Sequence, residues 1–238
     1  MVEDVVLLHG FGGTSRAWDA TLKYLPAQRY RPIPLDLPGH GDQSGIKRAI
    51  TFERCVASVL ERSPKRFVLA GYSMGGRIAL HVACAAPDRV ERLVLISTTA
   101  GIDNPGERSR RSRADRRLAS EIKKGTIEEF ADRWRSQPMF AGDPPEVDAL
   151  ARADHVRNSP EGVAAALRGV GTGEMEPLWK RLAELPMPVT VLAGRRDSKF
   201  VRIGERMVSL IPDSLLQVAS GGHCLLLENP KISAMAIT

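Results

Sequence analysis

Short apolar runs alternate with amphipathic stretches along the first hundred residues. The runs that we predict to be strands cover residues 5–8, 31–37, 66–70 and 93–96. The stretches with apolar side chains at helical spacing cover residues 15–25, 51–61 and 75–86. A short continuous apolar run is typical of a buried strand, whereas recurrence every three to four residues indicates a helix. This order favours an α/β fold with a mostly parallel sheet flanked by helices.

The alternation stops near residue 100 and resumes near residue 188. Residues 100–179 contain helical stretches such as 126–134 and 160–168 but no convincing strand. After them, the pattern predicts strands over 189–193 and 214–218, with a helix over 202–210 between them. A block of helices thus interrupts the strand pattern.

A length of 238 residues fits one α/β domain with an insertion better than two separate domains. We therefore predict an α/β core domain of about six strands, formed by residues 1–99 and 180–238. A helical cap is predicted over residues 100–179.

The charge balance leaves several classes of partner open. The chain carries 34 basic and 28 acidic residues, and 26 of the basic residues are Arg. Such a surplus suits nucleic acid, an anionic membrane surface or an acidic small molecule. No apolar run approaches the roughly 20 residues that cross a bilayer, and the three cysteines form no close pair. We expect a cytoplasmic protein without a disulfide framework or a metal site.

The segment Gly71-Tyr72-Ser73-Met74-Gly75 fits the pattern G-x-S-x-G. A predicted strand precedes it and a predicted helix follows it, which is the context that gives this short motif its meaning. The two glycines permit a sharp turn that raises the Ser73 hydroxyl above the edge of the sheet. Ser73 is therefore the candidate catalytic serine.

A serine at neutral pH needs a base and an acid, which in this architecture follow it along the chain in the order acid, then His. His223 is the one histidine after residue 188, and it follows the predicted strand 214–218. Asp197 follows the strand 189–193, whereas Asp213 lies in a turn that enters the next strand. We predict the triad Ser73, Asp197 and His223, with Asp213 as the less favoured acid.

A catalytic serine of this type works beside two backbone N–H groups that bind negative charge on oxygen. The candidates are the amide of Met74, directly after the serine, and the amide of Phe11 in the glycine-rich run His9-Gly10-Phe11-Gly12-Gly13. Small residues let this backbone come close to a ligand. A plain tight turn is the alternative interpretation of the run, and no phosphate-binding glycine pattern is present.

With these motifs in this order, the chain resembles the α/β-hydrolase superfamily over nearly its whole length. Within it, the chain is most similar to the 2-succinyl-6-hydroxy-2,4-cyclohexadiene-1-carboxylate synthase family of menaquinone biosynthesis. The segments that carry this narrower resemblance are Leu8-His9-Gly10-Phe11, Gly71 to Arg77, Trp134 with Gln137-Pro138-Met139-Phe140, and Asp197-Ser198-Lys199-Phe200.

Arginines near the candidate site are consistent with an anionic substrate. Arg77 lies one helical turn after Ser73, where the helix dipole disfavours a cation, so we expect an anionic group or a nearby carboxylate to compensate it. Arg111 can reach Asp115 at i+4. The resemblance implies that Tyr72, Arg77, Arg111, Trp134 and Arg157 bind substrate, whereas a solvated surface position is the alternative for Arg111 and Arg157.

The resemblance implies a lyase that removes a proton from its substrate and expels pyruvate, with no cofactor and no metal. The implied partner is a small polycarboxylate rather than nucleic acid or a membrane, and the implied assembly is a monomer or a small homo-oligomer. The alternative is a serine ester or thioester hydrolase that forms an acyl-enzyme. A hydrolase of apolar esters would need no buried Arg. We expect Cys224 to serve in packing, with sensitivity to oxidation as an alternative.

Overall fold

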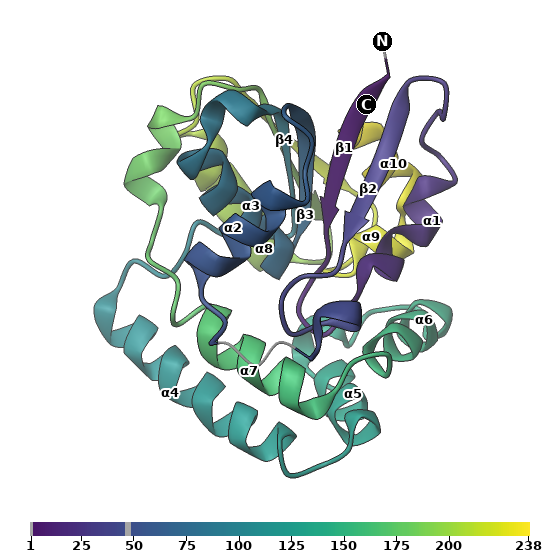
Figure 1. The fold of residues 1–238 in the computed structure, drawn as a ribbon, viewed down its shortest axis with the longest axis vertical. Helices are drawn as coiled ribbons and strands as arrows, with labels where there is room; N and C mark the ends of the chain where they lie inside the picture. The colour runs from purple at the N-terminus through teal and green to yellow at the C-terminus, as the bar shows by residue number, and fades with distance from the viewer. Residues whose placement is uncertain (1, 46–48) are drawn as a thin grey trace.

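A computed structural model describes residues 2–45 and 49–238 of the chain. Its centre is a parallel sheet of six strands in the order β2-β1-β3-β4-β5-β6. The strands are β1 (Glu3–Leu8), β2 (Tyr30–Leu35), β3 (Phe67–Tyr72), β4 (Val90–Ile96), β5 (Val189–Gly194) and β6 (Ser214–Ala219). The predicted sheet of about six strands is confirmed. Because all six strands are parallel, their carboxyl ends lie at the same edge of the sheet, where catalytic residues of α/β proteins gather (Figure 1).

The two faces of the sheet bury alternate residues of each strand. Val6 and Leu8 pack on one face with the helices α2 (Phe52–Glu61), α3 (Met74–Ala85) and α8 (Ser198–Val208). Val5 and Leu7 pack on the other face with Trp18, α9 (Leu225–Glu228) and α10 (Pro230–Ile237). Because both faces are covered, the central strands are continuous apolar runs rather than alternating ones.

The predicted elements differ from the structure mainly at their ends. The helix expected over residues 15–25 is a 3-10 turn over Ser15–Trp18 followed by the short helix α1 (Asp19–Leu22). The side chain of Thr14, and not that of Ser15, caps this turn by accepting the Arg16 N–H at 3.2 Å. A Ser or Thr can cap a helix at either of two adjacent positions, which sequence alone does not distinguish.

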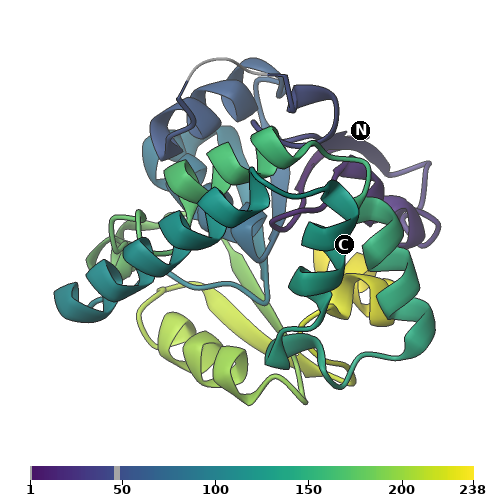
Figure 2. The same cartoon turned by 90° about the horizontal axis from the view of Figure 1, so that it is seen from below.

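Four helices lie between β4 and β5 and cover the carboxyl edge of the sheet (Figures 1 and 2). They are α4 (Pro105–Ile122), α5 (Ile127–Arg135), α6 (Pro145–His155) and α7 (Pro160–Val170). We call these helices and their connections the cap. Among the described residues between β4 and β5 there is no strand, as the pattern indicated. The boundaries of the cap and core as separate units stay a prediction.

Within the described parts of the chain, no helix is both long and apolar enough to cross a membrane.

Candidate active site

Ser73 occupies a strained turn between β3 and α3. Its backbone has φ 50° and ψ −107°, a region that residues with a side chain rarely adopt. The turn brings backbone segments so close that a Cβ on Gly71 would lie 2.4 Å from the Gly75 carbonyl oxygen, and one on Gly75 would lie 2.3 Å from that of Leu8. Only glycine fits at these two positions, which explains the motif physically.

Three side chains from the carboxyl ends of different strands meet at this turn. The Nε2 atom of His223 lies 3.2 Å from the Ser73 Oγ, and its Nδ1 atom lies 2.7 Å from the Asp197 Oδ2. His223 is fully buried. Because an ionised carboxylate only accepts hydrogen bonds, this geometry fits an imidazole that carries its proton on Nδ1 and accepts the serine hydroxyl proton at Nε2.

The position of the acid follows from the direction of the strands. Asp197 caps the helix α8 directly after β5, at the carboxyl edge where Ser73 lies. Asp213 immediately precedes β6 and therefore lies at the amino edge of the sheet. The sequence-based preference for Asp197 over Asp213 agrees with this geometry.

Two backbone N–H groups beside Ser73 are free to bind negative charge. Within residues 2–45 and 49–238, neither the Phe11 amide nor the Met74 amide donates a hydrogen bond to another residue. The Met74 amide begins helix α3, where the helix dipole adds partial positive charge. Both amides are therefore available as donors, and the oxyanion hole formed by them stays a prediction.

A cavity of about 600 Å³ opens from Ser73 beneath the cap. Of the residues predicted to bind substrate, it is lined by Arg77, Arg111 and Trp134, and Phe11 also borders it. The structure thus brings two arginines from different parts of the chain, one in α3 and one in α4, to the cavity that contains the candidate serine.

Arg77 is buried, and no carboxylate forms an ion pair with it within the described residues. Its Nη1 donates a 2.6 Å hydrogen bond to the Val170 carbonyl. Burial lowers the pKa of the Arg77 guanidinium to about 10, and the positive charge of Arg111 is the second cause of this shift. Arg77 therefore keeps its charge at neutral pH in a place where that charge is poorly compensated.

Arg111 forms the predicted i+4 ion pair, with its Nε 2.8 Å from the Asp115 Oδ1. The second oxygen of this buried carboxylate, Oδ2, has no hydrogen-bond partner among the described residues. The Asp115 carboxylate thus acts on two guanidinium groups, that of Arg111 directly and that of Arg77 through its charge.

The structure places one of the predicted binding residues away from both cavities and brings others to them. The Arg157 side chain is 55% exposed, lies 4.0 Å from Asp154 and lines neither cavity described here, because the turn after α6 directs the next residue, Asn158, inward. Lys199 and Arg206 of α8 line the large cavity instead. Lys199 lies in the segment Asp197-Ser198-Lys199-Phe200, which carries part of the family resemblance, so the sequence could have indicated it as a binding residue.

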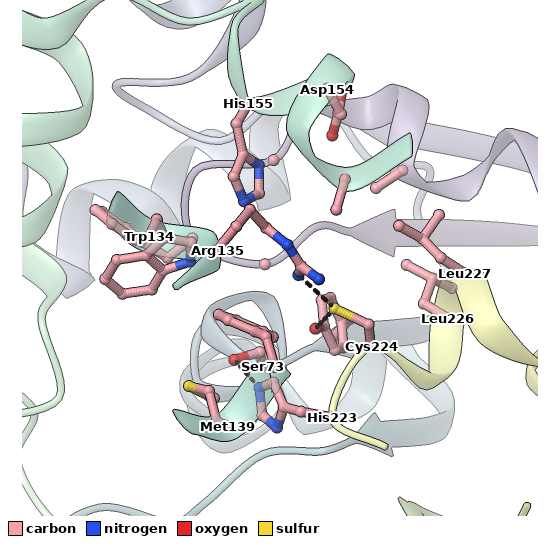
Figure 3. A pocket seen from close by; sticks show the side chains of 17 residues that line it. Ser73, Trp134, Arg135, Met139, Asp154, His155, His223, Cys224, Leu226 and Leu227 are labelled. Carbon is pink, nitrogen blue, oxygen red and sulfur yellow. Dashed lines mark hydrogen bonds between the residues drawn. The ribbon is translucent and has the colours of Figure 1, made fainter. Parts of the chain in front are cut away.

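A second, smaller cavity of about 50 Å³ also borders Ser73 and is mostly apolar (Figure 3). Tyr72, predicted to bind substrate, lines this cavity and not the large one, and its hydroxyl lies 3.6 Å from the Cys224 Sγ. Arg135 reaches from α5 to the same sulfur at 3.1 Å. Burial raises the pKa of the Cys224 thiol to about 12, so the thiol is in its unreactive protonated form.

Across residues 2–45 and 49–238, no group of three His, Cys, Asp or Glu side chains is arranged to hold a metal ion.

The fold, the strained serine turn and the Ser-His-Asp geometry together define a class of protein. The chain belongs to the alpha/beta hydrolase family, whose sequence pattern matches residues 5–234.

Relatives within that family are more specific. A Bacillus subtilis protein provisionally named 2-succinyl-6-hydroxy-2,4-cyclohexadiene-1-carboxylate synthase is 35% identical over 240 residues, covering 97% of this chain and 87% of the relative. The synthase of that name from Pectobacterium atrosepticum is 31% identical, covering 95% and 88%. The structure of MenH from S. aureus matches with a TM-score of 0.92 and 34% identity, covering 99% of this chain and 91% of that one. These likenesses place the chain in the synthase branch of the family.

Proposed function

We propose that this chain is a lyase that eliminates pyruvate from 2-succinyl-5-enolpyruvyl-6-hydroxy-3-cyclohexene-1-carboxylate. The product is 2-succinyl-6-hydroxy-2,4-cyclohexadiene-1-carboxylate, an intermediate of menaquinone biosynthesis. Relatives that carry the name of this synthase and match over nearly the whole chain support the proposal. The observation that carries it is the burial of Arg77 in the cavity that also holds Ser73 and Arg111.

The substrate bears three carboxylates, on the succinyl group, the ring and the enolpyruvyl group. Guanidinium groups bind carboxylates through paired, charge-assisted hydrogen bonds and do not lose their charge at neutral pH. We assign two of the carboxylates to Arg77 and Arg111. Lys199, which lines the same cavity, is our candidate for the third in place of Arg157. Trp134 provides an aromatic wall beside the ring.

The chemistry needs one base and one site for developing negative charge. With His223 as the proton acceptor, the Ser73 oxygen removes the ring proton next to the succinyl carbonyl. The electron pair of that C–H bond forms a new double bond, the existing double bond moves along the ring, and the C–O bond to the enolpyruvyl group breaks. The leaving enolate takes up one proton and becomes pyruvate, so the reaction needs no external oxidant or reductant.

Negative charge develops on the succinyl carbonyl oxygen as the proton leaves. The amides of Phe11 and Met74 are assigned to this oxygen, and a single donor of this kind contributes about 10²- to 10³-fold to a rate. Asp197 holds the His223 imidazole in the required tautomer and stabilises it when it is protonated.

The test is pyruvate release from the cyclohexene substrate, followed by coupled oxidation of NADH by lactate dehydrogenase. We expect the wild type to release pyruvate far above the spontaneous rate and Ser73→Ala to fall to that rate. Ser209→Ala, which changes an exposed serine in the turn after α8, is the matched control and should equal the wild type. Release at the spontaneous rate from both the wild type and Ser73→Ala would refute the proposed function.

A serine hydrolase is the second candidate, favoured by the small, mostly apolar cavity that also borders Ser73. In that case Ser73 would attack an ester carbonyl and form an acyl-enzyme. Efficient hydrolysis of p-nitrophenyl esters that Arg77→Ala leaves unchanged would favour it over the lyase.

A cytoplasmic location, the absence of nucleic-acid and membrane partners, and a monomer or small homo-oligomer remain predictions.

A further inference from the structure

The loop that carries the Phe11 amide, residues 9–14, is held by hydrogen bonds from two directions. We call it the oxyanion loop. On the core side, His40 contacts the loop and the Leu37 N–H contacts the loop's own His9, and on the cap side two polar residues near the end of α6 contact it. The contacts from the cap have no place in the chemistry described above.

The contacts on the core side involve two histidine rings. His9 donates from Nδ1 to the Gly10 carbonyl at 2.8 Å and accepts the Leu37 N–H at Nε2, 3.0 Å away. His40 accepts the Gly12 N–H at Nε2, 3.1 Å away. Burial lowers the pKa of both imidazoles, which keeps them neutral so that each Nε2 remains an acceptor.

The contacts on the cap side involve Asn158 and Asp154. The Asn158 Nδ2 donates a 2.6 Å hydrogen bond to the Gly12 carbonyl, and its Oδ1 accepts the Gly41 N–H at 2.8 Å. Asp154 accepts the Thr14 N–H at 2.8 Å. Asn158 is 8% exposed, so these hydrogen bonds are shielded from water and correspondingly strong.

The bond from Asn158 begins a chain that ends at the Phe11 amide. The Gly12 carbonyl and the Gly13 N–H belong to one peptide unit, and that N–H donates to the Gly10 carbonyl at 3.1 Å. The Gly10 carbonyl and the Phe11 N–H belong to a second peptide unit. In a planar trans peptide the carbonyl and the N–H point in opposite directions, so each hydrogen bond orients and polarises the next donor.

We propose that Asn158 is a positioning residue that directs and polarises the Phe11 N–H through these two peptide units, coupling the seating of the cap to oxyanion binding. The role in elimination rests on the proposed function, whereas the effect on the loop does not. When the cap is seated, the Phe11 amide points at the oxyanion. Without the Asn158 donor, the Gly12–Gly13 peptide keeps the bond from its N–H to Gly10 but loses the bond at its carbonyl, so it can rotate more easily. Gly12 has φ +76°, and glycine allows such rotation at little cost.

The test uses Asn158→Asp and Asn158→Ala. Asp keeps a side-chain oxygen for the Gly41 N–H and removes the amide donor to Gly12, and Ala removes both groups, so either one suffices if the other fails to fold. We expect pyruvate release to show a kcat that is lower by about 10- to 100-fold, part of the value of a whole oxyanion donor, with KM changed less than about threefold. Glu161→Gln, an exposed change in the first turn of α7, is the matched control and should behave as the wild type.

A second measurement does not depend on the lyase substrate. A p-nitrophenyl alkylphosphonate reacts with Ser73, releases p-nitrophenolate and leaves a phosphonyl oxygen in the oxyanion hole. We expect this reaction to slow by the same factor in the Asn158 variants. In the ¹⁵N-labelled phosphonylated protein, the amide proton signal of Phe11 should move upfield, whereas that of Met74, which belongs to α3, should stay in place.

Phosphonylation at the wild-type rate with an unchanged Phe11 signal would overturn the proposal. Parallel shifts of Phe11 and Met74 would also overturn it, because they would indicate general loosening of the site. If the wild type releases no pyruvate but the phosphonylation and Phe11 results hold, the proposed function fails and the role of Asn158 stands.

Discussion

Arg77 is buried within the electrostatic field of Arg111, and both line the cavity that contains Ser73. Burial and repulsion from Arg111 lower the pKa of Arg77 to about 10, so an anion bound in this cavity would relieve an unfavourable charge interaction. Asp115, which pairs with Arg111, compensates only part of this charge.

Replacing either cavity arginine should weaken the reaction of the polycarboxylate selectively. For Arg77→Ala and Arg111→Ala we expect kcat/KM for pyruvate release to fall by about 10- to 100-fold, since charge-assisted hydrogen bonds contribute about 1.5–3 kcal/mol each. Phosphonylation of Ser73 by a neutral phosphonate should change little. Arg157→Ala is the control, because this side chain is exposed and outside both cavities. A loss for Arg157→Ala equal to that for Arg111→Ala would contradict our placement of the two residues.

Replacing Asp197 should impair the reaction far more than replacing Asp213, the less favoured candidate acid. In Asp197→Asn the amide would favour the wrong tautomer of His223, and we expect kcat to fall by about 10²- to 10⁴-fold. Asp213→Asn is the matched control at the opposite edge of the sheet and should keep wild-type kinetics. Steady-state pyruvate release measures both. The triad assignment would be wrong if the two variants lost activity equally.

Acid should destabilise the fold partly through His155, which lines the small cavity. Neither of its ring nitrogens has a hydrogen-bond partner among the described residues, and burial lowers its pKa to about 3. The unfolded chain therefore binds more protons than the folded one between pH 6.5 and about 3, so stability falls as the pH falls through this window.

We expect His155→Leu to flatten that loss, by up to about 1.4 kcal/mol per pH unit below 6.5. Urea unfolding at pH 7.5 and pH 5 measures the difference. The other buried histidines contribute equally to both proteins and cancel. An identical pH dependence in the variant and the wild type would show that His155 is not held neutral.

Cys224 should be inert in the folded protein although it follows the candidate catalytic histidine directly. It is 4% exposed, and burial raises the pKa of its thiol to about 12. We expect iodoacetamide at pH 8 to leave Cys224 unmodified in the native protein and to alkylate it fully in urea, as read by mass spectrometry of peptides. Rapid native alkylation with loss of activity would instead favour the oxidation-sensitive alternative.

The sequence predicted those parts of the fold and site that depend on local pattern. Alternating strands and helices defined the sheet, and the direction of parallel strands was enough to prefer Asp197 over Asp213. The close approach of Gly71 and Gly75 to neighbouring backbone explains why the serine motif is readable without a structure.

The remaining details depend on side-chain direction, which a helical pattern fixes only to within about one residue. Arg157 and Asn158 are neighbours in the turn after α6, and the structure turns Asn158 inward. Arg135 was missed because a charged residue in an amphipathic helix is normally exposed. Its guanidinium is buried because it pairs with the carboxylates of Asp143 and Asp148, with N–O distances of 2.7 Å to each. The sequence does not reveal these pairings.

The cap leaves the core after β4 and returns at β5, and these two strands are neighbours in the sheet. The chain thus enters and leaves the cap between two adjacent strands. Ser73, Asp197 and His223 all lie outside the inserted helices. A change in the inserted helices would therefore leave the backbone positions of these three residues in place and would reach the candidate site mainly through Asp154 and Asn158, which hold the oxyanion loop.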